Sequence, residues 1–255
     1  MTDAKALAYV NMYGVLGCLE NLCALDDRAK EILSGLKKPV SLCFYVSDGP
    51  CATFHFTKTG CAVRRGQKDA TCKILFPSPA AFNKLIATGT LAGAPVKGPV
   101  QAITFLLGTF VPLTDRLTEL LRPDQETLKD RAFFEESTLL TLYTIAGAIS
   151  ALANHDPISK VSAQHTVDGD ILLGIRDRVY VTVRVKDHRF TTIKDKTPNP
   201  RAIMEFADID LANALFNGTA SSINELCKGR IHLAGMISMV DNVNRILDRV
   251  SVSLA

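Results

Sequence analysis

The chain has 255 residues, of which 47% are hydrophobic and 22% are charged, and its net charge is +3 at pH 7. These values are typical of a soluble globular protein and argue against the disordered and fibrous classes. The small positive excess is scattered along the chain, whereas a nucleic-acid-binding face needs a dense basic stripe, so we expect no nucleic-acid partner.

The cysteines and the apolar segments indicate a cellular location. The seven cysteines are odd in number and include no C-x-x-C motif, which predicts reduced thiols in the cytoplasm and no disulfide framework. The N-terminal residues lack a basic region followed by an apolar core, so we expect no secretory signal. The most apolar stretch, residues 138–152, is shorter than the roughly 20 residues that span a bilayer. We therefore expect a buried helix there and no stable membrane insertion.

The first half of the chain begins with two predicted helices and continues as a meander. Residues 4–25 predict a helix that is apolar around more than one face and must be covered on several sides. Residues 26–36 predict a shorter helix with Asp26 or Asp27 as its N-cap. Period-two alternation, which is typical of an antiparallel meander, then runs over residues 42–46, 52–56 and 61–65.

The first half closes with a strand, a capped helix, a short strand and a long helix. A fourth strand is predicted over residues 70–76 and leads into a helix that Ser78 caps and Gly89 ends. A short fifth strand follows near residues 95–97. The last helix, residues 103–121, contains Pro112, which should kink or split it.

The second half predicts a similar order of elements after a polar linker at residues 122–129. An apolar helix over residues 135–154 is followed by Asp156 and Pro157, after which the residues look more strand-like. The next predicted strands are residues 171–175, 179–185, 190–193 and 202–206. Asp208 caps a helix that ends at Gly218, and a fifth strand is predicted at 230–233. The apolar stripe of the closing helix is Met236, Val240, Val243, Leu247 and Val250.

The two halves match at a nearly constant spacing. At a spacing of 130 residues, Tyr13 meets Tyr143 and Gly17 meets Gly147. At 129, the matched pairs are Phe56 with Val185, Phe82 with Leu211, Ile86 with Leu215 and Gly89 with Gly218. Eight extra residues then follow in the second half. Chance similarity of two generic stretches is the alternative, but the shared order favours duplication into copies at 1–125 and 126–255. We expect an α+β fold in which each copy has a five-stranded, mainly antiparallel sheet covered by helices on one face.

The second copy resembles a known family. Ala202-Ile-Met-Glu-Phe206, Asp208, Leu211, Gly218 and the run from Lys228 to Met236 are similar to the sterol carrier protein type 2 sterol-binding domain. The resemblance covers residues 169–254 well and 40–121 more faintly. It implies an apolar tunnel between sheet and helices that binds fatty acids, acyl-CoAs or sterols without catalysis, metal or cofactor. The chain ends Val-Ser-Leu-Ala and so lacks the peroxisomal address, and we expect a bacterial cytoplasmic protein.

We predict no catalytic or metal site. Cys51 and His55 share one face of a strand, but Cα atoms four residues apart lie about 13 Å from each other, too far for a nucleophile–base pair. The five histidines show no H-x-x-x-H spacing and form no zinc pattern with the cysteines. His232 alternates with two apolar neighbours and is expected to be solvated or hydrogen-bonded.

The predicted ligand-lining residues are apolar and lie at matching places in the two copies. In the first copy they are Phe54, Phe56, Phe82, Ile86, Leu106 and Phe110. In the second copy they are Val181, Val183, Phe206, Leu215, Phe216, Met236, Met239, Val240 and Val243. Methionine adapts to ligands of variable shape, but it fills ordinary cores at least as well. Two alternatives remain: a filled structural module that serves partner binding or homodimerisation, and a thioester-processing enzyme that uses Cys51 or His55.

Overall fold

The protein is described by a computed structural model that covers residues 3–89 and 94–254. The chain divides into two compact units between Glu136 and Ser137, whereas the sequence placed the boundary at 125/126. The first unit therefore continues through the polar stretch and a short 3-10 turn at Thr127–Lys129. We call the two units the first copy and the second copy, and each is described by itself.

The first copy begins with a helix of irregular hydrogen bonding. The regular helix predicted over 4–25 is wrong in its interior. The segment consists of α1 (Ala4–Val10), a π turn (Asn11–Val15), a 3-10 turn (Leu16–Cys18) and α2 (Leu19–Leu25). Glycines occur in both irregular turns, and glycine supports a regular helix less well than other residues. Helix α3 (Asp27–Ser34) then begins as predicted, because the Asp26 carboxylate accepts a hydrogen bond from Ala29 N at 2.6 Å.

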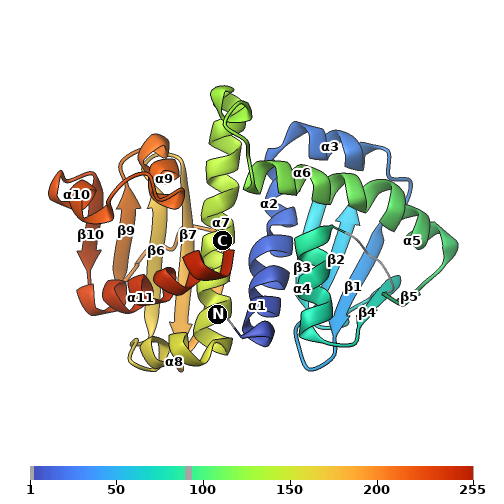
Figure 1. Ribbon diagram of the computed structural model, residues 1–255, viewed down its shortest axis with the longest axis horizontal. Helices are drawn as coiled ribbons and strands as arrows, with labels where there is room; N and C mark the ends of the chain where they lie inside the picture. Colours follow the sequence, from blue (N-terminus) through green and yellow to red (C-terminus); the bar gives the residue numbers. More distant parts are fainter. Residues whose placement is uncertain (1–2, 90–93, 255) are drawn as a thin grey trace. The chain divides into compact units, whose positions relative to one another are not determined.

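The first sheet has five strands in the order β3-β2-β1-β4-β5 (Figure 1). The strands are β1 (Val40–Val46), β2 (Cys51–Thr57), β3 (Gly60–Arg65), β4 (Cys72–Phe76) and β5 (Val96–Lys97). The predicted meander is confirmed for β1 to β3. Strand β4 pairs with β1 in parallel, so the sheet is mixed, although its other pairs are antiparallel.

The helices that close the first copy carry the predicted caps and the predicted break. Ser78 caps α4 (Pro79–Thr88), and Gly89 ends it with a left-handed φ of 67°. The predicted helix at 103–121 is split into α5 (Val100–Phe105), a π turn (Leu106–Phe110) and α6 (Val111–Leu121). Pro112 is the second residue of α6, where its missing N–H costs least.

The second copy repeats this plan. Its strands are β6 (Gly169–Ile175), β7 (Val179–Lys186), β8 (Arg189–Ile193), β9 (Ala202–Phe206) and β10 (Ile231–Gly235). Their order is β10-β9-β6-β7-β8, in which β6 and β9 are the parallel pair. The helices are α7 (Arg131–His155), whose residues up to Glu136 belong to the first unit, α8 (Pro157–Gln164), α9 (Ile209–Phe216), α10 (Ser222–Cys227) and α11 (Ile237–Leu254). Figure 1 shows α9 and α11 over one face of this sheet, with α10 beside β10 at its edge.

Helix α8 and helix α10 were not predicted. The expectation of strand-like residues after Asp156 is wrong, because the Asp156 side chain caps α8 through Ser159 N at 3.0 Å and Pro157 occupies its first turn. The β-branched Ile158 and Val161, which suggested a strand, are exposed on this helix. Helix α10 occupies the extra residues of the second copy.

Helix α7 meets the length and composition expected of a membrane-spanning helix. It has 25 residues, and 72% of its most apolar window is buried within the structure. Its buried positions include small residues such as Ala146, Gly147 and Ala148, which suit close packing in a protein interior.

Strand register confirms that the two copies correspond residue by residue. Leu42 pairs with Phe54 as Ile171 pairs with Val183, a spacing of 129. In the parallel pairs, Phe44 pairs with Ile74 on β4 as Leu173 pairs with Met204 on β9. Ile74 and Met204 are therefore matched at a spacing of 130. The caps keep this spacing into the next helix, since Ser78 bonds Ala81 N as Asp208 bonds Leu211 N. The structure thus matches Phe82 with Ala212 and Ile86 with Phe216, one residue beyond the pairs predicted from the sequence.

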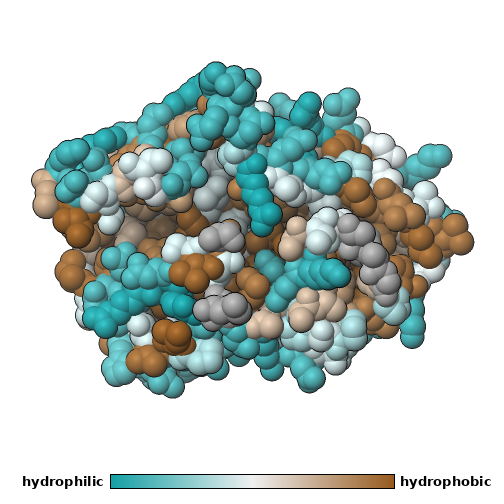
Figure 2. All heavy atoms as spheres, viewed as in Figure 1, coloured by the Kyte–Doolittle hydropathy of each residue, from teal (hydrophilic) through white to brown (hydrophobic). Residues whose placement is uncertain are grey.

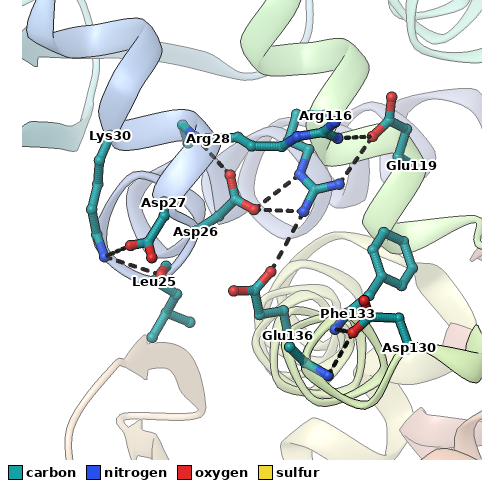
Figure 3. Close-up of polar contacts among 12 residues, drawn as sticks. Leu25, Asp26, Asp27, Arg28, Lys30, Arg116, Glu119, Asp130, Phe133 and Glu136 are labelled. Atoms are coloured by element: carbon teal, nitrogen blue, oxygen red, sulfur yellow. Dashed lines mark hydrogen bonds and ion pairs between the residues drawn. The ribbon is translucent and has the colours of Figure 1, made fainter. Parts of the chain in front are cut away.

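Each copy also holds a buried capping aspartate against an arginine of its last helix. Arg116 donates from Nε and Nη2 to Asp26 at 2.9 and 2.7 Å, and Arg249 Nε donates to Asp156 at 3.4 Å. Both carboxylates are 2% exposed. Arg116 also lies 3.5 Å from Glu136, whose pKa is raised by burial and by the neighbouring Asp26 charge (Figure 3). In each copy the aspartate–arginine contact connects the start of a short helix, α3 or α8, with the last helix, α6 or α11.

Candidate functional site

Phenylalanine rings occupy the region between sheet and helices in the first copy. The ring of Phe44 lies 5.5 Å from those of Phe54 and Phe110 and 6.5 Å from that of Phe82, measured between centroids. Phe56 lies 5.9 Å from Phe110. These separations are those of favourable aromatic pairs. Of the predicted residues here, all but the half-buried Ile86 are buried: Phe54, Phe56, Phe82, Leu106 and Phe110.

The predicted residues of the second copy fall into a deep group and a rim group. The deep group is buried and consists of Val181, Val183, Phe206, Met239, Val240 and Val243. Leu215 and Phe216 are half-buried on α9. Met236 is 37% exposed and precedes α11, so the prediction that it belongs to the buried stripe is wrong. Half-buried Leu247 also lies off that stripe, whose members are Met239, Val240, Val243, Ile246 and Val250.

The deep residues of the second copy are smaller than their counterparts. Strand register, helix caps and the arginine contacts pair five phenylalanines of the first copy with residues of the second: Phe44 with Leu173, Phe54 with Val183, Phe56 with Val185, Phe82 with Ala212 and Phe110 with Val243. Two replacements run the other way, since Phe190 stands at the position of Cys61 and Phe216 at that of Ile86. Aliphatic side chains therefore replace the aromatic cluster at the centre of the second interior.

Apolar side chains surround an open hollow at one end of the second interior. Leu233 on β10 is half-buried and faces the helices with Met204. Figure 2 shows a recessed apolar surface between α9 and α11, over β6 and β9 as drawn in Figure 1. Exposed apolar residues also occur on α10 and at the start of α11: Ile223 (72%), Leu226 (42%), Met236 (37%) and Ile237 (57%). An apolar surface of this kind marks a binding groove more often than an isolated residue does.

Sequence reasoning missed three of these exposed apolar residues. Ile223 and Leu226 belong to α10 and Ile237 opens α11. The available signal was the insertion of eight residues in the second copy, because it carries apolar side chains that a solvent-exposed loop does not need.

The opposite face of the first sheet carries the cysteine and histidine that were weighed as a catalytic pair. His55 Nδ1 lies 2.7 Å from Ser41 Oγ, and Cys51 Sγ lies 3.8 Å from Cys43 Sγ. Burial and the neighbouring Cys43 raise the pKa of Cys51 to about 12, so this thiol stays protonated near neutral pH. His232 on β10 is exposed, in agreement with the expectation of a solvated or hydrogen-bonded side chain. Across residues 3–89 and 94–254, no cluster of three His, Cys, Asp or Glu side chains is arranged to hold a metal ion.

Comparison with known proteins finds similarity at the level of structure. No protein-family model and no curated protein match the sequence. A crystal structure of sterol carrier protein 2 is 15% identical with a TM-score of 0.33, and the match covers 43% of this chain and 92% of that one. A conserved protein from Thermus thermophilus, described as possibly a sterol carrier protein, is 17% identical with a TM-score of 0.32 over 44% and 86% of the two chains. The UbiJ-SCP2 ubiquinone synthesis protein is 19% identical with a TM-score of 0.25 over 40% and 94%. The family that the sequence resembles is thus also found among structures similar to this chain.

Proposed function

We propose that the second copy binds an apolar ligand of the fatty-acid, acyl-CoA or sterol class in the hollow between α9 and α11. The observation that carries this proposal is the recessed apolar surface between α9 and α11 (Figure 2). The elements beside it carry apolar side chains that are incompletely buried: Leu215 and Phe216 on α9, Leu233 on β10 and Met236 just before α11. The sequence resemblance implies the same class of ligand.

The interior below the hollow suits an acyl chain. Met204 on β9, which pairs with Leu233, and Met239 on α11 are buried, and methionine side chains rearrange around guests of different shape. Each methylene of a bound chain that leaves water contributes about 0.8 kcal/mol, so a long chain is held without specific polar contacts. The lining residues carry no group suited to general acid–base chemistry, which favours carriage of the ligand over its chemical conversion.

The first copy has a different role in this proposal. Its rings contact one another between sheet and helices, which favours a structural module with a filled core. We therefore expect one ligand per chain.

The proposal is tested by ligand uptake in the full-length protein. Native mass spectrometry of gently purified protein should show one lipid per chain, and a fluorescent fatty acid should bind saturably to stripped protein. Leu215→Asp places a charge in the half-buried rim and should weaken binding at least tenfold. Ile158→Asp makes a comparable change at a 60% exposed position of α8 and should leave binding unchanged. Absence of co-purified lipid together with no saturable uptake would refute the proposal, as would equal binding by the two variants.

A further inference from the structure

The second copy has a separate cleft on the face of its sheet that points away from α9 and α11. Its volume is about 400 Å³, which is within the range of small-molecule sites. Leu172 and Ile203 form its floor and pair across β6 and β9. Their neighbours Leu173 and Met204 face the helices, and because side chains alternate along a strand the floor residues face the other way.

A fixed segment forms one wall of this cleft. Residues 194–201 connect β8 to β9, and Pro198 and Pro200 of this segment line the cleft. Thr182 Oγ1 donates to Asp195 O at 2.6 Å and accepts from Thr197 N at 3.0 Å. Thr197 Oγ1 donates to Asp170 at 2.8 Å. The wall is therefore in place before a ligand arrives, which lowers the ordering cost of binding.

The corresponding segment of the first copy keeps the threonine contacts but is shorter and lacks the prolines. Thr53 makes the matching contacts, with Gly66 O at 2.7 Å and Lys68 N at 3.2 Å. The spacing between copies changes from 129 to 130 across this segment, so it is one residue longer in the second copy. It contains no proline in the first copy. The wall formed by the two prolines is thus specific to the second copy.

Tyr180 is held at one end of the cleft by a glycine and a carboxylate. A Cβ atom on Gly174 would overlap the Tyr180 ring, so the ring lies directly against this backbone. Its hydroxyl donates to Glu205 at 2.8 Å, and the Lys196 ammonium lies 4.1 Å from the ring centroid. In the first copy the corresponding pair is Tyr45 and Cys51, so no ring lies against a glycine at this place.

The polar groups of the cleft offer more donors than acceptors. Glu205 accepts from Arg176 Nε at 2.7 Å and from Tyr180, one bond to each oxygen. Burial raises the pKa of Glu205, but the bonds from Arg176 and Tyr180 outweigh it and bring the pKa below its ordinary value. Among the residues that the structure describes, Lys196 forms no salt bridge. The terminal nitrogens of Arg176, the Lys196 ammonium and the exposed His232 ring therefore remain to bind a guest.

We propose that this cleft binds a small organic anion, a carboxylate or phosphate carried on an apolar body. The anionic group contacts Lys196 and the terminal nitrogens of Arg176, and the body lies on Leu172 and Ile203 beside the two prolines. Charge-assisted hydrogen bonds hold the anionic group. The apolar floor contributes affinity only for anions that carry an apolar group, so simple inorganic ions should bind more weakly. This site is independent of the apolar hollow on the other face.

The experiment is a chemical-shift titration of the full-length protein with phenyl phosphate as probe. Saturable shifts are expected at the amides of the non-proline residues of 194–201 and of β6 and β9. Benzyl alcohol tests the apolar body alone, and inorganic phosphate tests the anionic group alone. Each should bind at least tenfold more weakly than phenyl phosphate. Equal binding of either compound, or the absence of saturable shifts, would overturn the proposal.

Two variants locate the binding. Lys196→Met should weaken phenyl phosphate about tenfold, since a hydrogen bond to a charged group is lost. Lys160→Met makes the same change on the exposed side of α8 and should have no effect. If both variants bind alike, the anion does not sit at Lys196 and the assignment fails. Leu215→Asp, which tests the apolar hollow, should leave phenyl phosphate binding intact, so the two proposals fail or stand separately.

Discussion

Removal of Arg249 should expose how much the buried aspartate of the second copy depends on its partner. Arg249→Met keeps most of the side-chain length but removes the charge beside Asp156, which is 2% exposed. Breaking a buried ion pair typically costs about 3–5 kcal/mol, because the remaining charge stays buried without its partner. Here the contact is long, at 3.4 Å, and Ser159 still donates two hydrogen bonds to the carboxylate. We therefore expect a loss of about 2–3 kcal/mol in the free energy of unfolding.

Two further arginines serve as comparisons. Arg116 contacts Asp26 at 2.7 Å and is 11% exposed, so Arg116→Met should cost more, about 3–4 kcal/mol. Arg245 pairs with Asp241 on the same helix as Arg249, but both side chains are more than half exposed. Arg245→Met should therefore cost less than about 1 kcal/mol.

The pKa of Asp156 determines how the stability loss in Arg249→Met changes with pH. Burial raises the pKa of Asp156, but the hydrogen bonds from Ser159 and the Arg249 charge outweigh it and bring the pKa below its ordinary value. A depressed carboxyl pKa stabilises the fold above the unfolded pKa of about 3.9, and this contribution is lost as pH falls through the folded pKa. The stability difference between wild type and Arg249→Met should thus be largest near pH 7 and shrink toward pH 3.

The assay is urea unfolding at several pH values, with hydrogen exchange of α8 and α11 amides to assign the loss to the second copy. Asp156→Asn in the Arg249→Met background should recover part of the loss, because the unpaired charge is removed. The reasoning is refuted if Arg249→Met costs no more than Arg245→Met, or if the difference from wild type grows on acidification.

Three other changes test the packing and the caps. Phe54→Val removes part of a fully buried ring that contacts Phe44 and should cost about 2–4 kcal/mol by urea unfolding; a loss below about 1 kcal/mol would contradict a filled first core. Ser78→Ala removes the cap of α4 and should cost about 1 kcal/mol, with faster hydrogen exchange confined to the first turn of that helix. Gly174→Ala should displace the Tyr180 ring, which a changed tyrosine ring resonance would report; an unchanged resonance would show that the ring does not rest on this glycine.

Local sequence signals predicted much of the fold. Ser78 and Asp208 were identified as N-caps and act as such, because capping depends on neighbouring residues alone. Strand alternation placed the central strands within a few residues of their observed bounds. The parallel pairing of β1 with β4 and of β6 with β9 was not predicted, since pairing direction depends on where the chain crosses the sheet.

The misses have identifiable causes. Ile158 and Val161 favoured a strand, but the Asp156 cap and Pro157 decided for a helix in which both apolar side chains remain exposed. Met236 fitted the helical spacing of the last stripe, yet the helix begins one residue later. The far-face cleft had no sequence signal, because its walls come from separate segments that only the folded sheet brings together.

Comparison of the two copies distinguishes the contacts that both keep around the sheet from the interior residues in which they differ. Both keep the same strand register, the same threonine contact beneath the β3–β4 or β8–β9 connection, and a buried aspartate held by an arginine. The threonines alternate with the strand residues that face the helices, and the aspartates lie at helix starts, so these contacts do not depend on what occupies the interior. The centre is then free to differ, as phenylalanine rings in one copy and smaller aliphatic residues in the other. A duplicated domain of this kind can keep one copy as a packed support while the other retains an apolar opening, which is the division that the ligand-uptake experiment measures as one ligand per chain.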